Sequence, residues 1–214
     1  TFYFYLQIQN HVWDFTYHEH YSYFLVKPLV DYFSRLDMEL IDIKPNLTKG
    51  GSMRCTVQLK GGVQAVDNSV QEHIDEEIGA GFHGPDQNLV FQRYQENIDK
   101  GKIDYRELVD DFKGQGKKIV GYGACATATT LMYHYDMHDD LTYLVDDFEA
   151  KHGLYSPGTH IPVHPSDHIY QERPDVIVIL AWRYHEKIIS RHKKFLESGG
   201  QFIVPLPDLR TVSR

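Results

Sequence analysis

Hydrophobic residues recur at helical spacing in some stretches of the chain and alternate with polar residues, as in strands, in others. In the first part, residues 23–36 carry apolar side chains at helical spacings, which predicts a helix. Residues 1–15 are aromatic and partly alternating, which favours a strand. Residues 38–47 and 50–59 alternate between apolar and polar side chains, and they predict the two strands of a hairpin.

The middle of the chain is more polar. Residues 68–79 predict a polar helix, and residues 88–112 predict a longer one. The sequence KIDY at residues 102–105 could interrupt the longer helix. The sequence KGQGKK at residues 113–118 predicts a turn and a boundary between two parts of the protein.

After this turn, short β-branched runs alternate with helical stretches. The run DVIVILAW is apolar throughout, as expected of a parallel strand that is covered on both faces. The helix predicted at residues 183–200 is basic and amphipathic, and it ends at two glycines. This alternation predicts an α/β fold with a Rossmann-like parallel sheet. The strands are predicted at residues 118–124, 141–147, 175–182 and 201–207, with a further helix at residues 125–135.

The composition narrows the classes of function. The length of 214 residues suits one large domain or two small ones. The net charge of −8 argues against sequence-independent nucleic-acid binding, which needs a concentrated basic surface. No apolar run approaches the ~18 residues of a membrane span, so we expect no membrane insertion. The two cysteines, Cys55 and Cys125, cannot form a cysteine-rich zinc site, and we expect reduced thiols.

The sequence GYGACA, residues 121–126, follows a predicted strand and opens a predicted helix. It matches the pattern G-x-G-x-x-A, in which Gly121 and Gly123 permit a tight turn and close approach of a pyrophosphate to the backbone. Asp146 and Asp147 end the next strand, where an acidic residue can bind ribose hydroxyls. The loop has no lysine, and Thr127 can donate a hydrogen bond without neutralising charge. The pattern indicates either nucleotide binding or a purely structural turn.

A second candidate site lies in YSPGTHIPV, residues 155–163. Pro157 and Gly158 predict a turn. Thr159 and His160 follow it, close in sequence to the carboxyl edge of the sheet, where ligands of open α/β sheets bind. His160 could contact a ligand or lie in a surface loop, and both alternatives stay open.

Titratable and aromatic residues are concentrated in TYHEHYSYF, residues 16–24. In an extended segment, Tyr17 and Glu19 face one way, and His18 and His20 face the other. Two histidines could chelate a metal, but no third ligand can be assigned, so we predict no metal site. A histidine of near-neutral pKa is suited to proton abstraction, and a neighbouring carboxylate can fix its tautomer. The alternative is an ordinary polar strand end.

The order of the motifs carries more information than any one motif. TYHEHYSYF, GGSMR, IVGYGA, VDDFEAKHGLYSPGTHIPV, ILAW and FIVPLP follow one another along nearly the whole chain. In this combination the sequence resembles the S-adenosylmethionine-dependent C-methyltransferases of deoxysugar nucleotide biosynthesis. The resemblance implies a three-part parent: a small N-terminal zinc domain, a middle domain for the methyl donor, and a C-terminal α/β domain for the nucleotide-linked sugar.

The resemblance implies that this chain is a C-terminal portion of such a parent. Residues 1–60 would be the tail of the class I methyltransferase domain with the hairpin, residues 61–117 a helical connector, and residues 118–214 the Rossmann-like domain. S-adenosylmethionine would be bound mainly by residues upstream of this chain, and zinc only by the absent N-terminal domain. We therefore expect a cytoplasmic parent enzyme and a chain that is inactive alone.

The resemblance also implies roles for individual residues. His20 would take a proton from the carbon beside a ketone of the sugar, with Tyr17 and Glu19 as close support. The resulting enolate would attack the methyl group of the donor. The sugar would be linked to thymidine diphosphate. The residues expected to bind this substrate are Gly121, Tyr122, Gly123, Thr127, Asp146, Thr159, His160 and Trp182.

Two positions depart from the family pattern. The family usually carries a lysine where this chain has Thr127, and a histidine where it has Lys49. Both departures concern phosphate binding or the identity of the sugar nucleotide. Two other functions stay open: a dinucleotide-binding oxidoreductase domain, based on Gly121, Gly123 and Asp146, and a non-catalytic module that binds nucleotide sugars. The sequence does not specify the sugar, the methylated carbon or the oligomeric state.

Overall fold

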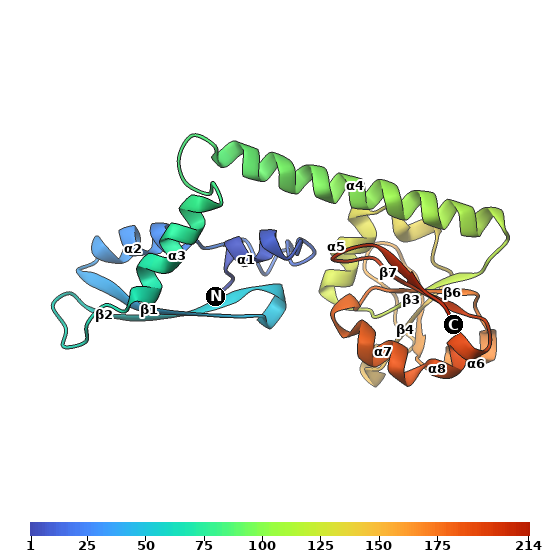
Figure 1. Cartoon of the computed structure of the whole chain (residues 1–214). Coiled ribbons are helices and arrows are strands. Elements are labelled where there is room, and N and C mark those ends of the chain that lie inside the picture. Colours follow the sequence, from blue (N-terminus) through green and yellow to red (C-terminus); the bar gives the residue numbers. More distant parts are fainter. The chain divides into compact units, whose positions relative to one another are not determined.

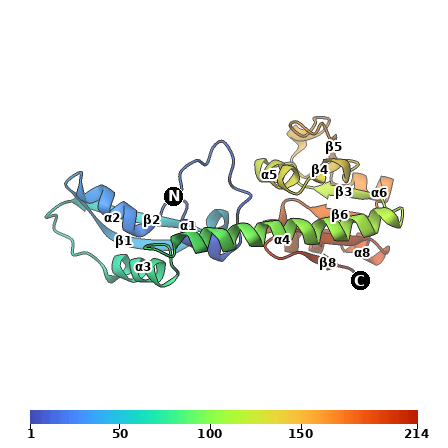
Figure 2. The ribbon, with the colours of Figure 1, turned by 90° about the horizontal axis from the view of Figure 1, so that it is seen from above.

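The computed structural model describes all 214 residues, which divide into two compact units. The first unit consists of residues 1–13 and 18–98, and the second of residues 14–17 and 99–214. Figure 1 shows the ribbon coloured along the sequence, and Figure 2 shows it turned by 90°. Helix α4 (Gln87–Gly114) begins in the first unit and ends in the second.

The first unit is built on an antiparallel hairpin. Strand β1 (Met38–Asn46) pairs with strand β2 (Ser52–Leu59) along its whole length. The register shifts between Leu40 and Asp42. A single turn of 3-10 helix, η1 (Thr48–Gly50), joins the two strands. The hairpin places the loop residues 46–54 beside the chain start, which also belongs to this unit.

Three helices pack on the hairpin. Helices α2 (Val26–Ser34) and α3 (Asn68–Gly79) contact β1, and the short helix α1 (Phe4–Gln9) contacts β2. Burial of apolar surface between these elements is the main force that holds the unit together. The buried side chains of this core are Tyr3, Ile8, Leu25, Val26, Leu40, Ile43, Met53, Val70 and Phe82.

A buried carboxylate holds the start of α2. The Glu77 side chain is fully buried, and its oxygens accept hydrogen bonds from the backbone amides of Val26 at 2.5 Å and Lys27 at 3.2 Å. Nε2 of His83 lies 2.8 Å from Oε2 of Glu77. Helix α2 has no capping side chain at its own N-terminus. Glu77 therefore satisfies amides that a helix start leaves unpaired, and its charge suits the helix dipole.

The predicted hairpin and helices of this unit are confirmed. Helix α2 lies within residues 23–36, and α3 has the predicted bounds 68–79. Helix α4 continues through residues 102–105, so the sequence KIDY does not interrupt it.

The strand predicted for residues 1–15 is wrong, because residues 4–9 form α1. In this helix the amide of Gln7 donates to the carbonyl of Tyr3, and the amide of Asn10 donates to the carbonyl of Leu6. Aromatic residues favour strands chiefly through packing against neighbouring strands. Here Tyr3 packs into a core of helices and hairpin instead, so tertiary packing overrides the local preference.

The second unit contains a six-stranded sheet of order β5-β4-β3-β6-β7-β8. The strands from β5 to β7 are parallel, and β8 is antiparallel to β7. Strands β4 and β5 follow β3 on one side of it, and β5 forms that edge of the sheet. The chain then returns to the other side of β3, where β6 pairs with it. The carboxyl ends of β3 and β6 therefore lie at the switch point of the sheet, where ligands of this architecture bind. The strands are β3 (Ile119–Tyr122), β4 (Leu144–Asp146), β5 (Val163–Pro165), β6 (Val176–Ile179), β7 (Gln201–Val204) and β8 (Arg210–Val212).

Short helices connect these strands, and the predicted α/β fold with a mostly parallel sheet is confirmed. In Figure 1, α7 and α8 lie on one side of the sheet, and the later part of α4 lies on the other. The helices of the chain are too short or too polar to cross a membrane. The connecting elements are α5 (Ala126–His134), η2 (Met137–Asp139), η3 (Glu149–Lys151), α6 (His168–Glu172), η4 (Trp182–Tyr184), α7 (His185–Arg191) and α8 (Lys193–Glu197).

The prediction of one helix over residues 183–200 is wrong, because the helix breaks at His192. The backbone of His192 has φ −105° and ψ 34°, and its side chain is buried between two tyrosine hydroxyls. The edge strands β5 and β8 were not predicted. Each has only three residues and, unlike the equally short β4, no apolar run that would reveal it.

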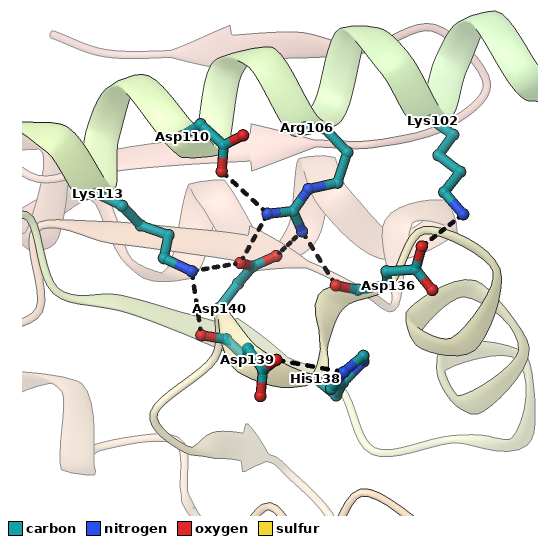
Figure 3. Close-up of polar contacts among 8 residues, drawn as sticks. All are labelled: Lys102, Arg106, Asp110, Lys113, Asp136, His138, Asp139 and Asp140. Carbon is teal, nitrogen blue, oxygen red and sulfur yellow. Dashed lines mark hydrogen bonds and ion pairs between the residues drawn. The ribbon is translucent and has the colours of Figure 1, made fainter.

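A cluster of charged residues joins the later part of α4 to η2 and Asp140 within the second unit (Figure 3). The Asp140 side chain, just after η2, is fully buried and binds the guanidinium of Arg106 through both oxygens. Nζ of Lys113 also donates to Oδ1 of Asp140, at 3.0 Å. A buried carboxylate without partners is costly. These two cations therefore account for the burial of Asp140.

Candidate functional site

Gly121, within β3, and Gly123, directly after it, are both required by packing. A Cβ atom on Gly121 would lie 2.5 Å from Cδ2 of Leu144 and 2.9 Å from Cδ1 of Leu180. Gly123 has a φ of +108°, and a Cβ atom there would lie 2.7 Å from Cβ of Ala181. Only glycine tolerates such positions without strain. The pattern G-x-G-x-x-A therefore has a structural reason even without a ligand.

Asp146, at the end of β4, is bound to the glycine loop. Its Oδ2 accepts a hydrogen bond from the amide of Ala124 at 2.7 Å and from Nζ of Lys151 at 3.0 Å. Its Oδ1 accepts from the amide of Phe148 at 2.9 Å. The side chain thus stabilises the loop and orients Lys151. Direct contact of Asp146 with a substrate stays a prediction.

A pocket of about 320 Å³, which we call the glycine-loop pocket, lies at the carboxyl ends of β3, β4 and β6. Three cations line it: Lys151 from η3, and Lys187 and Arg191 from α7. Lys151 pairs with Asp146 and Arg191 with Asp147, so the charge of Lys187 is left in excess. Sequence analysis missed the three cations, because they are far from the loop in sequence. The basic character of residues 183–200 was the available signal. The remaining lining residues are Tyr122, Gly123, Cys125, Asp146, Asp147, Ala181, Tyr184 and Ile188.

Five of the eight predicted substrate-binding residues lie outside the lining of this pocket: Gly121, Trp182 and the three described next. Thr127 is in the first turn of α5, with its Oγ1 3.2 Å from Sγ of Cys125. Oγ1 of Thr159 lies 2.5 Å from Oγ of Ser156. His160 is exposed and has a positive φ of 53°. For all three, a role in ligand binding stays a prediction.

Trp182 is hydrogen-bonded to Asp14, which lies near the start of the chain. Its Nε1 donates to Oδ2 of Asp14 at 2.9 Å, and Arg183 donates to the same oxygen at 3.1 Å. The guanidinium of Arg183 also lies 3.9 Å from the ring centroid of Phe15. Burial raises the pKa of the Asp14 carboxyl, whereas the charge of Arg183 and these hydrogen bonds act in the opposite direction. Contact of Trp182 with a substrate stays a prediction.

A second pocket, of about 650 Å³, lies in the first unit and contains Glu19 and His20, so we call it the histidine pocket. The hairpin and its turn contribute Asn46, Lys49 and Arg54. The pocket thus combines an imidazole and a carboxylate with two cations. Its other lining residues are Thr1, Phe2, Tyr21, Ser22, Thr48, Ser52 and Met53.

The surroundings of His20 favour its neutral form. Its ring packs edge-on against the ring of Phe2, with centroids 4.4 Å apart and an interplanar angle of 84°. Burial lowers the pKa of His20, the charge of Lys49 lowers it further, and Glu19 opposes both effects. A neutral imidazole is the form that can accept a proton from a substrate.

The structure brings Glu19 and His20 into one pocket but assigns Tyr17 to the second unit. The ring of Tyr17 stacks on that of Phe15, with centroids 6.4 Å apart. His18 is exposed, and its Nε2 lies 4.0 Å from Oε1 of Glu19. Residues 18 and 19 form a turn, so the expected extended segment is wrong at this point.

A family profile described as "C-methyltransferase C-terminal domain" matches residues 47–207, which is most of the chain. The chain belongs to this C-methyltransferase family. The matched region includes Lys49, the glycine loop and the three cations of its pocket, whereas Glu19 and His20 precede it.

The chain is also similar to a curated bacterial protein, C-methyltransferase NovU from Streptomyces niveus. The two sequences are 29% identical over 207 residues, which is 96% of this chain and 49% of the relative. The chain thus spans about half the length of the C-methyltransferase it matches.

A C-methyltransferase needs a methyl donor, for which the family suggests S-adenosylmethionine. This donor carries a sulfonium cation and no phosphate group. Lys151, Lys187 and Arg191 surround the glycine-loop pocket, and their charge suits an anionic ligand. The excess positive charge of this pocket does not suit the sulfonium cation of S-adenosylmethionine. No group of three or more histidine, cysteine, aspartate or glutamate side chains is placed to hold a metal ion.

Proposed function

We propose that this chain is the sugar-nucleotide half of a C-methyltransferase that acts on a nucleotide-linked keto-deoxysugar. One observation carries the proposal. The glycine loop at the switch point of the sheet opens onto a pocket with three cations from two separate connections. Such a pocket suits a diphosphate, because charged side chains make strong hydrogen bonds to its oxygens. We assign thymidine as the nucleoside because of the motifs that resemble the deoxysugar family.

In this proposal His20 takes the proton from the carbon beside the ketone. Its position in the histidine pocket and its lowered pKa support this role. Glu19 lines the same pocket and favours the protonated form of His20 that follows proton transfer. Lys49 and Arg54 supply positive charge where the enolate oxygen needs stabilisation. Tyr17 remains a proposed supporting residue.

The methyl donor is outside this chain in our proposal. S-adenosylmethionine, when bound to the part of the parent that precedes these residues, supplies an electrophilic methyl group. The proposed domain limits follow this division: residues 1–60 end the donor domain, residues 61–117 connect, and residues 118–214 hold the nucleotide. A cytoplasmic parent is part of the same proposal.

The oxidoreductase alternative rests on Gly121, Gly123 and Asp146. The two glycines have packing reasons that do not involve a ligand. The Asp146 carboxylate accepts hydrogen bonds from two backbone amides and from Lys151, where a dinucleotide enzyme would use such an acid for ribose hydroxyls. These contacts remove Asp146 from that argument, whereas the neighbouring Asp147 is exposed to a ligand. The non-catalytic module stays a second candidate, because our proposal assigns the donor site to residues outside this chain.

Methyl transfer by the complete parent enzyme tests the proposal. With isotopically labelled S-adenosylmethionine and a thymidine diphosphate-linked keto-deoxysugar, we expect the label on the carbon beside the ketone. This chain alone should bind the sugar nucleotide and leave it unmethylated. Hydride transfer from NADH to the sugar would favour the oxidoreductase, and binding without any reaction of the complete protein would favour the non-catalytic module.

A further inference from the structure

A buried histidine in the second unit takes no part in the proposed reaction. His192, between α7 and α8, is 2% exposed. Its Nδ1 lies 2.9 Å from the hydroxyl of Tyr170, and its Nε2 lies 3.1 Å from the hydroxyl of Tyr122. The Tyr122 hydroxyl in turn donates to Oδ1 of Asp147 at 2.8 Å. Four side chains thus form one continuous row of hydrogen bonds.

The carboxylate fixes the direction of every bond in this row. An ionised carboxylate only accepts, so Tyr122 gives its single proton to Asp147. The oxygen of Tyr122 must then accept from His192, which places the ring proton on Nε2. The Nδ1 atom of the neutral ring accepts from Tyr170. Burial lowers the pKa of His192, in agreement with a neutral ring, while Asp147 acts in the opposite direction.

The row ends at a carboxylate that lines the glycine-loop pocket. Asp147 follows β4 directly, and its Oδ2 is bound by the guanidinium of Arg191. Tyr122 contacts the same pocket. The side chain of Asp147 is 45% exposed, in contrast to the 12% of Asp146, so Asp147 is the carboxylate that a ligand can reach.

We propose that His192 is a positioning residue: through Tyr122 it holds Asp147 as the acceptor for a pentose hydroxyl of a bound nucleoside diphosphate. The inference rests on the proposed function, which assigns a nucleoside diphosphate to this pocket. Lys151, Lys187 and Arg191 bind the phosphates, and Asp147 accepts a hydrogen bond from the pentose hydroxyl. A fixed acceptor discriminates strongly, because a ligand that lacks the hydroxyl leaves it partly unpaired.

A buried histidine could also contribute to packing alone. The ratio of the affinities for a nucleotide with and without the pentose hydroxyl separates a packing role from a positioning role. We would measure binding of thymidine diphosphate and of its 3′-deoxy analogue to the full chain by calorimetry. Loss of packing weakens both ligands alike, whereas loss of the positioned acceptor weakens only the hydroxyl-bearing one. The unaltered chain should prefer thymidine diphosphate by about tenfold, the value of one hydrogen bond to a charged group.

The variants address each part of the row. His192→Leu should reduce the preference to less than about threefold. His192→Gln should retain most of it, because the amide nitrogen of glutamine can replace Nε2 as the donor to Tyr122. Tyr122→Phe removes only a hydroxyl, and it should act like His192→Leu even if that variant folds poorly. His164→Leu replaces a histidine outside the row and should keep the full ratio.

Equal affinity of the unaltered chain for the two nucleotides would overturn the assignment of Asp147. A full tenfold preference in both His192→Leu and Tyr122→Phe would overturn the role of His192. Both results leave the proposed function standing, because the nucleotide still binds. If neither nucleotide binds to the unaltered chain, the proposed function and this inference fail together.

Discussion

The backbone amide of Ala124 donates to Oδ2 of Asp146 at 2.7 Å. The acidic residue that ends β4 is therefore bound inside the protein, to the same loop whose glycines suggested a dinucleotide site. Lys151 binds the same oxygen and adds a cation to the pocket. These contacts occupy Asp146 inside the protein and place a cation beside the diphosphate that we propose for this pocket.

The cations of the glycine-loop pocket should determine its affinity. Lys187→Gln should weaken thymidine diphosphate binding by about tenfold, because a charged donor to a phosphate oxygen is lost. The slope of affinity against salt concentration should also become smaller. Lys193→Gln is the matched control, since Lys193 begins α8 and does not line the pocket. Equal calorimetric affinities for both variants would remove Lys187 from the site.

His20 should be the base of the parent enzyme. His20→Asn should lower turnover by ~10²–10⁴-fold, the usual contribution of general-base catalysis. Affinity for the sugar nucleotide should change little, because the glycine-loop pocket is unaltered. Exchange of the substrate's α-proton with D₂O, followed by NMR, should stop. Near-normal turnover of this variant would make Tyr17 the next candidate, tested as Tyr17→Phe.

The pH dependence of the parent enzyme should reflect the environment of His20. A base must be unprotonated, so activity should be lost as the pH falls through the pKa of His20, which burial and Lys49 lower below its ordinary value of 6.5. Lys49→Asn removes one cause of that shift, so the acidic limb of kcat/KM should move to higher pH. Asparagine also tolerates the positive φ of 54° at this position. Lys44→Asn, outside the pocket, should leave the limb in place.

The charged cluster of Figure 3 should stabilise the second unit. Asp140→Asn leaves Arg106 and Lys113 without their buried partner, and the free energy of unfolding should fall by roughly 3 kcal/mol. Lys102→Gln breaks a pair with Asp136, whose side chain is 55% exposed, and it should cost much less. Urea unfolding of both variants measures the difference. Equal losses would show that burial of Asp140 is not what gives the cluster its strength.

The sequence predicted those parts of the fold that depend on local patterns. The helix at residues 68–79 and the hairpin have clear periodicity, the central strands have short apolar runs, and the structure has all of them in place. Helix α1 was missed because the packing of Tyr3 in the core outweighs the preference of aromatic residues for strands. The break at His192 was missed because it depends on Tyr122 and Tyr170, which lie far away in sequence.

In the candidate sites too, local patterns could be predicted, whereas contacts between residues distant in sequence could not. Gly121, Gly123 and Asp146 were recognised from their spacing, yet the contacts that define their roles, with Ala181 and Lys151, depend on the folded chain. Lys151, Lys187 and Arg191 reach one pocket only because β4 and β6 flank β3 in the sheet. A strand order of this kind cannot be obtained from periodicity alone.

Calorimetric titration of the chain with three ligands tests the central claim most directly. The ligands are thymidine diphosphate, NADH and S-adenosylmethionine, each added separately at the same ionic strength. Our account predicts binding of thymidine diphosphate, weakened by salt, and little binding of the other two. Tight binding of NADH with none of thymidine diphosphate would contradict the account and favour the oxidoreductase.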